Sequence, residues 1–98
     1  MKAPLRQRQE AAEMLAIQAL GFIAAEPERL RRFLDMTGIE AAEIRAAARA
    51  PRFLAGVLEH MLADESLLLA FAAEAGIDPA EVARARSLIG PDWERDLP

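Results

Sequence analysis

The stretch MLADESLLLAFAAEAGI, residues 61–77, decides the fold, because it is a helix-length run with almost no polar face. Asp64 precedes its leucines, where a carboxylate accepts hydrogen bonds from the free N–H groups of a first helical turn. Gly76 follows its last alanine, and glycine adopts the left-handed conformation that ends many helices while the next residue, Ile77, packs back. Apolar side chains surround the axis between these ends, which is typical of a buried helix. We therefore expect this stretch to form the buried centre of the fold.

The rest of the chain predicts further helices around this centre. Alanine is abundant, β-branched residues are scarce, and tyrosine and cysteine are absent, a composition that favours helix over sheet. Apolar spacing and starting prolines predict helices over residues 5–25, 27–36, 40–50, 51–62 and 80–89. Ile44 is the only large apolar residue of the third helix, which we expect to be the weakest. The sequence thus predicts an all-α fold, a compact bundle of about six short helices.

Length and charge bound the organisation of the chain. Ninety-eight residues supply one hydrophobic core, so we expect a single domain over 1–98, with a folded core at 5–90 and a short tail at 91–98. We expect neither a signal peptide nor a membrane helix, because charges of both signs precede the first apolar run and that run is short. The lack of cysteine suits a reducing compartment, so we expect a cytoplasmic protein.

Sliding the chain by 38 residues aligns it with itself. Phe33 falls on Phe71 and Gly38 on Gly76, and the residues after each glycine match in type. This pattern predicts two pseudo-repeated three-helix units around the buried central helix. The alternative is convergence, since any helix that ends in Gly-Ile and is followed by an acidic cap produces a similar pattern.

Two long segments carry a resemblance to a known family. These are ALGFIAAEPERLRRFLDMTGIEAAEIR and FLAGVLEHMLADESLLLAFAAEAGID, in this order and followed by a Gly-Pro tail. Over residues 14–90 the chain resembles a family of small bacterial helical proteins of unknown function. The resemblance implies a helical fold and no activity, ligand or catalytic residue.

Groups that could carry chemistry are few. His60 precedes Asp64 by one helical turn, but a usable metal site needs three or four ligands. Asp64 and Glu65 are adjacent at a helix start, where carboxylates serve as caps more often than as an acid and base pair. We therefore expect no catalytic residue, no metal site and no cofactor.

Two surfaces are candidates for binding a partner. The first is cationic, and with the only tryptophan it comprises Arg29, Arg32, Arg45, Arg49 and Trp93. The arginines lie in pairs one turn apart, so each pair shares a helix face that can meet carboxylates or phosphate, although such residues are usually only solvated. Trp93 docks either on its own domain or on a partner.

The second surface is a helix-turn-helix-like corner at Gly76, whose cations are Arg84 and Arg86. The surrounding half of the chain is acidic, which opposes phosphate binding.

We therefore expect a small non-catalytic protein-interaction module. Its partner is another protein or a second copy of the chain in a homodimer, met through apolar residues of the helices at 5–25 and 51–62. The alternative is a nucleic-acid-binding regulator that uses this corner; no membrane or small-molecule partner is expected.

Overall fold

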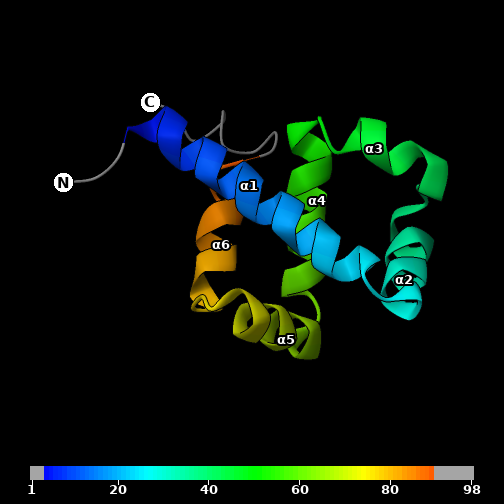
Figure 1. Cartoon of the computed structure of the whole chain (residues 1–98). Coiled ribbons are helices and arrows are strands. Elements are labelled where there is room, and N and C mark those ends of the chain that lie inside the picture. Colours follow the sequence, from blue (N-terminus) through cyan, green and yellow to red (C-terminus); the bar gives the residue numbers. More distant parts are fainter. Residues whose placement is uncertain (1–3, 90–98) are drawn as a thin grey trace.

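The computed structural model describes residues 4–89 of the chain, which form six α-helices and one turn of 3₁₀-helix (Figure 1). In chain order these are α1 Leu5–Ala24, α2 Pro27–Thr37, η1 Ala41–Glu43, α3 Ile44–Ala47, α4 Pro51–Leu62, α5 Glu65–Ala75 and α6 Ala80–Arg86. No strand occurs among the described residues, and the predicted all-α class is confirmed.

The ends of α5 follow the sequence prediction. The Asp64 carboxylate accepts a hydrogen bond from the backbone N–H of Leu67 at 3.2 Å, which satisfies a free donor of the first turn. At the other end Gly76 is left-handed, with φ at 69°, and the N–H of Ile77 donates to the carbonyl oxygen of Ala72 at 3.0 Å. This is the hydrogen bond expected of a Schellman-type helix end.

The other helix boundaries are also local features of the sequence. Pro27 and Pro51 occupy the first turns of α2 and α4, as predicted, and Gly38 ends α2 with φ at 75°. The segment predicted as one helix over 40–50 is shorter, because it contains η1 and a single turn of α3. Its alanines bury little apolar surface, so packing adds little to hold a longer helix there.

The centre of the bundle is α4, so the prediction that residues 61–77 form the buried centre is wrong in its choice of helix. Helix α4 contacts α1, α5 and α6, and it buries five side chains: Leu54, Ala55, Val57, Leu58 and Met61. In α5 only Phe71 and Ala72 are buried, and Leu69 is 50% exposed. The outer side of α5 carries three alanines, two glutamates and a serine beside Leu69. Alanine costs little to expose, and so an apolar run did not mean burial on every side.

Helix α1 is the longest element and crosses α4 and α6 before the chain turns into α2 (Figure 1). Aromatic contacts hold α5 to α1 and α2 to α4. The ring of Phe22 on α1 lies 5.5 Å from that of Phe71 on α5, measured between centroids. Phe33 of α2 is fully buried and meets the rings of Phe53 and His60 of α4 edge-on, at 5.9 and 5.1 Å. The buried side chains among the described residues are all apolar.

The 38-residue repeat stays a prediction. Gly38 and Gly76 share the left-handed conformation, and Phe33 and Phe71 are both buried. These shared features are also those that any two helices with such ends would show.

Leu58→Ala is expected to lower the free energy of unfolding by about 2 to 5 kcal/mol, because Leu58 is fully buried at the centre of α4. Leu69→Ala, on the half-exposed side of α5, should cost less than about 1 kcal/mol. Urea unfolding followed by circular dichroism measures both. A larger loss of unfolding free energy for Leu69→Ala than for Leu58→Ala would indicate that α5, and not α4, is the central helix.

Gly76→Ala is expected to destabilise the protein by about 1 kcal/mol, because alanine is strained at a φ of 69°. The matched control is Gly56→Ala within α4, where an added Cβ meets nothing within 4 Å and the backbone is helical. That change should stabilise the protein by about 0.5 to 1 kcal/mol. The same sign of effect at both positions would contradict the assignment of the Gly76 turn.

Candidate protein-interaction surface

Helix α1 buries a row of alanines and exposes two large apolar side chains. Three of its five buried residues are alanines, Ala12, Ala16 and Ala19. Met14 and Ile17, by contrast, are 62% and 46% exposed. Small inward side chains let a helix approach its neighbours closely. Leu20 and Ile23 are the large buried residues of α1, whereas Met14 and Ile17 lie on the side that faces away from the bundle.

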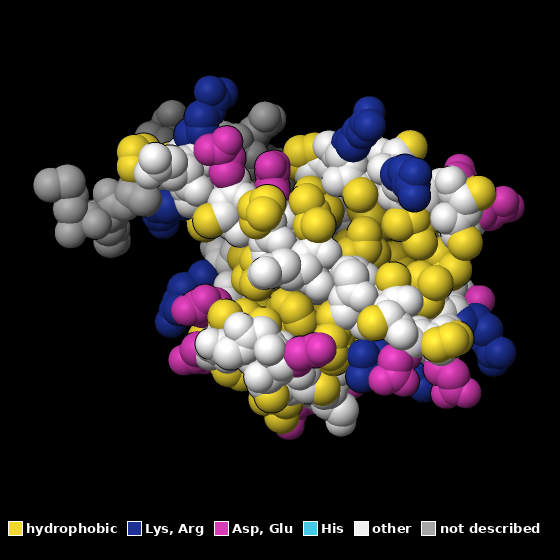
Figure 2. Space-filling model, viewed as in Figure 1, with side chains coloured by type: hydrophobic (Ala, Val, Ile, Leu, Met, Phe, Trp, Pro, Cys, Tyr) yellow, Lys and Arg dark blue, Asp and Glu magenta, His cyan; other side chains and the backbone are white. Residues whose placement is uncertain are grey.

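This side of α1 also lacks charge. Residues 14–25 read MLAIQALGFIAA and contain no charged side chain. We define the α1 outer face as the exposed residues of this run: Met14, Ile17, Gln18, Gly21, Ala24 and Ala25. Figure 2 shows this side of the molecule, where hydrophobic side chains gather over and beside α1 and charged side chains lie mainly around the margin. An uncharged apolar surface with a polar margin is typical of a protein-binding site.

Two hollows border the α1 outer face along one flank, the side towards α5 and α6. Between α1 and α5, a hollow of about 290 Å³ lies beside Gly21 and is lined in part by Phe22 and Phe71. Between α1 and α6, a larger groove of about 640 Å³ is lined by Met14 and Leu15 and carries Arg84. The outer face is thus bordered by depressions along this flank.

The sequence predicted binding through apolar residues of the helix at 5–25 but did not indicate which of them point outward. The signal was the spacing of Ala12, Ala16 and Ala19, which fall on one side of a helix at intervals of four and three residues. This alanine seam indicates the inward side of the helix, and Met14 and Ile17 fall on the opposite side.

The predicted cationic surface begins with Arg29, which has a structural role. Its guanidinium lies 4.0 Å from the centroid of the Phe22 ring and donates to the Phe22 carbonyl oxygen at 3.2 Å. It also forms an ion pair with Glu26 at 3.1 Å. These contacts fix the corner between α1 and α2 and leave the side chain only 29% exposed.

The remaining predicted cations are more exposed. Arg32 is 71% exposed and lies 3.7 Å from the Asp64 carboxylate, within a hollow that Arg29 and His60 also line. Arg45 on α3 and Arg49 in the turn after it are exposed, and neither lines that hollow. Trp93 lies outside the described residues.

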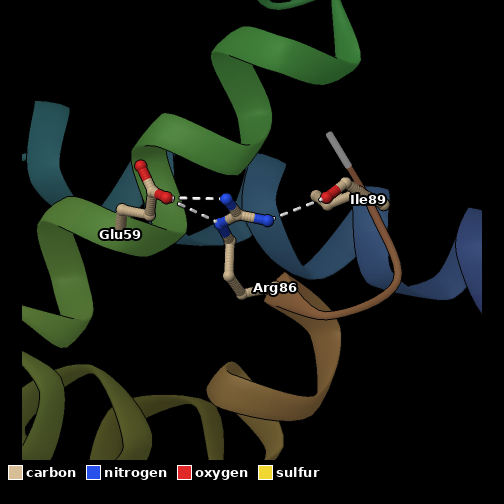
Figure 3. A network of polar contacts seen from close by, with 3 residues as sticks. All are labelled: Glu59, Arg86 and Ile89. Atoms are coloured by element: carbon tan, nitrogen blue, oxygen red, sulfur yellow. Dashed lines mark hydrogen bonds and ion pairs between the residues drawn. The ribbon is translucent and has the colours of Figure 1, made fainter. Parts of the chain in front are cut away.

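Arg86, one of the two predicted nucleic-acid contacts, connects α6 to α4 (Figure 3). Its Nε and Nη2 atoms donate to Oε1 of Glu59 at 3.0 and 2.6 Å, and Nη1 donates to the carbonyl oxygen of Ile89 at 3.1 Å. The Arg86 side chain is 17% exposed, so most of its donors are directed into the fold. Arg84, the other predicted contact, is exposed at the groove beside α1.

His60 lies beside the ring of Phe33 and lines one hollow with Arg32 and Asp64. Burial lowers the pKa of His60 below its ordinary value of 6.5; the nearby Asp64 carboxylate raises the pKa, and Arg32 lowers it further. Within residues 4–89 no group of three metal-ligating side chains occurs. The His60 ring packs edge-on against the ring of Phe33.

The pKa of His60 predicts a pH dependence of stability. Above pH 6.5 the imidazole is neutral in both the folded and the unfolded chain, so it contributes no pH dependence to the free energy of unfolding. Below that pH the unfolded chain binds the proton more readily, so the free energy of unfolding falls as the pH drops. Urea unfolding at about pH 7.5 and pH 5.5 should show a smaller loss in His60→Gln than in wild type. An equal or larger loss in the variant would contradict this account.

Comparison with known proteins gives a family and no activity. No helix among the described residues is both long and apolar enough to cross a membrane. No curated protein and no solved structure matches the chain. The model of one family does match, over residues 9–92, and its description is Protein of unknown function (DUF3572). This confirms the resemblance seen in the sequence: the chain belongs to the DUF3572 family.

Proposed function

We propose that the protein is a small non-catalytic protein-interaction module that binds its partner through the α1 outer face. One observation carries the proposal: α1 buries alanines and exposes Met14 and Ile17 within a run that has no charge. Scattered apolar residues on a surface need no explanation, but a contiguous uncharged face does. Covering it with a partner removes apolar surface from water at a gain of about 25 cal/mol per Å².

The second helix that sequence reasoning offered for binding is not available. The apolar stripe of α4 is buried in the core, with Phe53 and Leu62 partly covered. Of the two helices predicted for binding, α1 is the one that exposes large apolar side chains. The partner is a protein, since an uncharged apolar helix face suits another packed surface better than a phosphate or a small polar molecule.

The polar groups of the fold support a non-catalytic role because they hold structure. Asp64 caps α5, and Asp78 accepts a hydrogen bond from the N–H of Ala80 at 2.9 Å. Glu59 binds Arg86, and Glu40 and Glu43 form a capping box. Carboxylates bound in this way are already engaged with backbone N–H groups or with an arginine of the same fold. The lack of cysteine suits a cytoplasmic module.

A nucleic-acid-binding regulator remains the alternative. It has less support, because Arg86 is engaged with Glu59 and Ile89, which leaves Arg84 as the exposed cation of the predicted pair. One exposed cation supplies little of the phosphate contact that such binding depends on.

Ile17→Glu should abolish partner capture, because it places a charge in the middle of the α1 outer face. Immobilised wild-type protein and the variant are compared for the proteins each retains from a lysate of the source cell, with quantification by mass spectrometry. The control is Met36→Glu, which introduces the same charge at a residue of α2 that is 67% exposed. Both variants should fold, since both positions are exposed.

Loss of the retained proteins with Ile17→Glu alone supports the α1 outer face as the binding surface. Equal retention by wild type, Ile17→Glu and Met36→Glu would remove that surface from the proposal. Retention of nucleic acid that is lost in Arg84→Glu would favour the alternative.

A further inference from the structure

We propose that the groove between α1 and α6 is occupied by the C-terminal segment of the same chain, residues 90–98, with the Trp93 side chain on the apolar floor of the groove. The segment reads GPDWERDLP and lies outside the described residues. The inference goes beyond the proposed function, because it names the occupant of a second surface, which borders the α1 outer face. It rests on the size of the groove, on the point where the chain leaves it, and on the charges of both parts.

The groove has the size and the lining that an indole requires. Helices α1 and α6 pack against each other (Figure 1), and the groove between them has a volume of about 640 Å³. Leu15, Ile77 and Leu88 line it, and each of them also packs partly buried against the core. Hollows of about 300 to 1,000 Å³ hold ligands larger than an indole. Tryptophan combines a large apolar ring with one N–H group, so it suits an apolar groove with a wet rim.

The chain leaves the described fold beside the groove. Leu88 lines the groove, and the next residue, Ile89, is buried, with its carbonyl oxygen held by Nη1 of Arg86 at 3.1 Å. A Gly-Pro pair follows, which is typical of turns. Trp93 is five residues after Leu88, so at about 3.3 to 3.6 Å per extended residue it reaches up to roughly 17 Å from Leu88. Glu81, which lines the groove two helical turns before Leu88, is only about 10 Å away along α6, and the segment is therefore long enough.

The charges of the segment and of the groove are opposite. The segment has three acidic residues and one arginine, so its net charge is −2. The groove has Arg8 on the side of α1 and Arg84 on the side of α6, against one acidic residue, Glu81. Both arginines are exposed, and within residues 4–89 neither forms an ion pair. An acidic segment supplies the carboxylates that these two cations lack.

The order of residues in the segment also fits the groove. In an extended chain, successive side chains point to opposite sides. With Trp93 directed onto the floor, Asp92 and Glu94 on either side of it are directed to the rim, where Arg8 and Arg84 are exposed. Exposed ion pairs contribute little each, so the indole supplies most of the binding and the carboxylates fix its direction.

The covalent link selects this segment over a separate partner. A separate partner loses translational and rotational freedom when it binds, whereas a segment that starts beside the groove has already lost most of that freedom. Short flexible links give effective concentrations of about millimolar. A separate peptide of the same composition must therefore reach about that concentration before it displaces the segment.

Trp93 fluorescence tests the proposal, because the chain contains no other tryptophan and no tyrosine. The emission of the full chain should be shifted to the blue relative to the same chain in urea, and acrylamide should quench it less. The double variant Arg8→Glu with Arg84→Glu should shift the emission to the red and increase the quenching, because like charges then meet at the rim.

The matched control is Arg31→Glu with Arg45→Glu, which makes the same change in net charge at exposed residues that do not line the groove. It should leave the emission and the quenching unchanged. A wild-type emission equal to that of the unfolded chain would overturn the proposal, as would equal effects of the two double variants.

Charge exchange tests the placement of the segment in this groove. Reversing the segment alone, with Asp92→Arg and Glu94→Arg, should also shift the emission to the red. Combining this change with Arg8→Glu and Arg84→Glu should restore the blue-shifted emission, because opposite charges face each other again. An absence of recovery in the combined variant would overturn the placement.

The concentration dependence of the emission identifies the occupant. A segment that docks on its own chain gives the same emission from about 1 to 100 µM, because its effective concentration is fixed by the link. A blue shift that develops only as the concentration rises would assign the groove to the segment of a second copy and overturn the proposal.

Discussion

The close approach of α1 to the α4 helix is the constraint on which the rest of the structure depends. Helix α1 presents Ala12, Ala16 and Ala19 to the bundle, and α4 presents its one broad apolar stripe. Small side chains on one partner and large ones on the other let the two axes approach while the leucines fill the space between. The helices α2, α5 and α6 then attach to this pair, through buried Phe33, Phe71 and Val82 respectively. The same constraint that places one side of α1 against the bundle directs Met14 and Ile17 outward on the other side.

Helix ends could be predicted from the sequence because they depend on residues a few positions apart. Asp64 binds a backbone N–H three residues on, and Gly76 closes a helix through its own backbone conformation. The identity of the central helix could not be predicted in this way. Residues 65–75 and residues 51–62 are both apolar, and which of them is enclosed depends on where distant helices lie. An alanine-rich run is compatible with burial and with exposure, because each alanine contributes little to either.

The candidate site was likewise predictable from the sequence only in part. The absence of charge from residues 14–25 is a property of the sequence, but the direction of Met14 and Ile17 became visible only with α1 in place. Arg86 illustrates the converse: its partner Glu59 is 27 residues away, so no local pattern distinguishes this arginine from Arg84 two positions earlier. Similarly, Arg29 looked like a surface cation until the Phe22 ring and carbonyl were found beside it.

The uniformly apolar character of the buried side chains among the described residues has a consequence for how the fold is specified. Buried polar networks fix a unique packing in many proteins, because a shifted arrangement leaves their hydrogen bonds unmade. The described part of this core contains no buried polar network. Aliphatic residues of similar volume replace one another in cores at a small cost in stability. The alanine seam must supply the specificity instead, since any bulkier residue at 12, 16 or 19 separates two helices rather than filling a void. Evolutionary drift is thus expected to be freer among the leucines of this protein than among its smallest side chains.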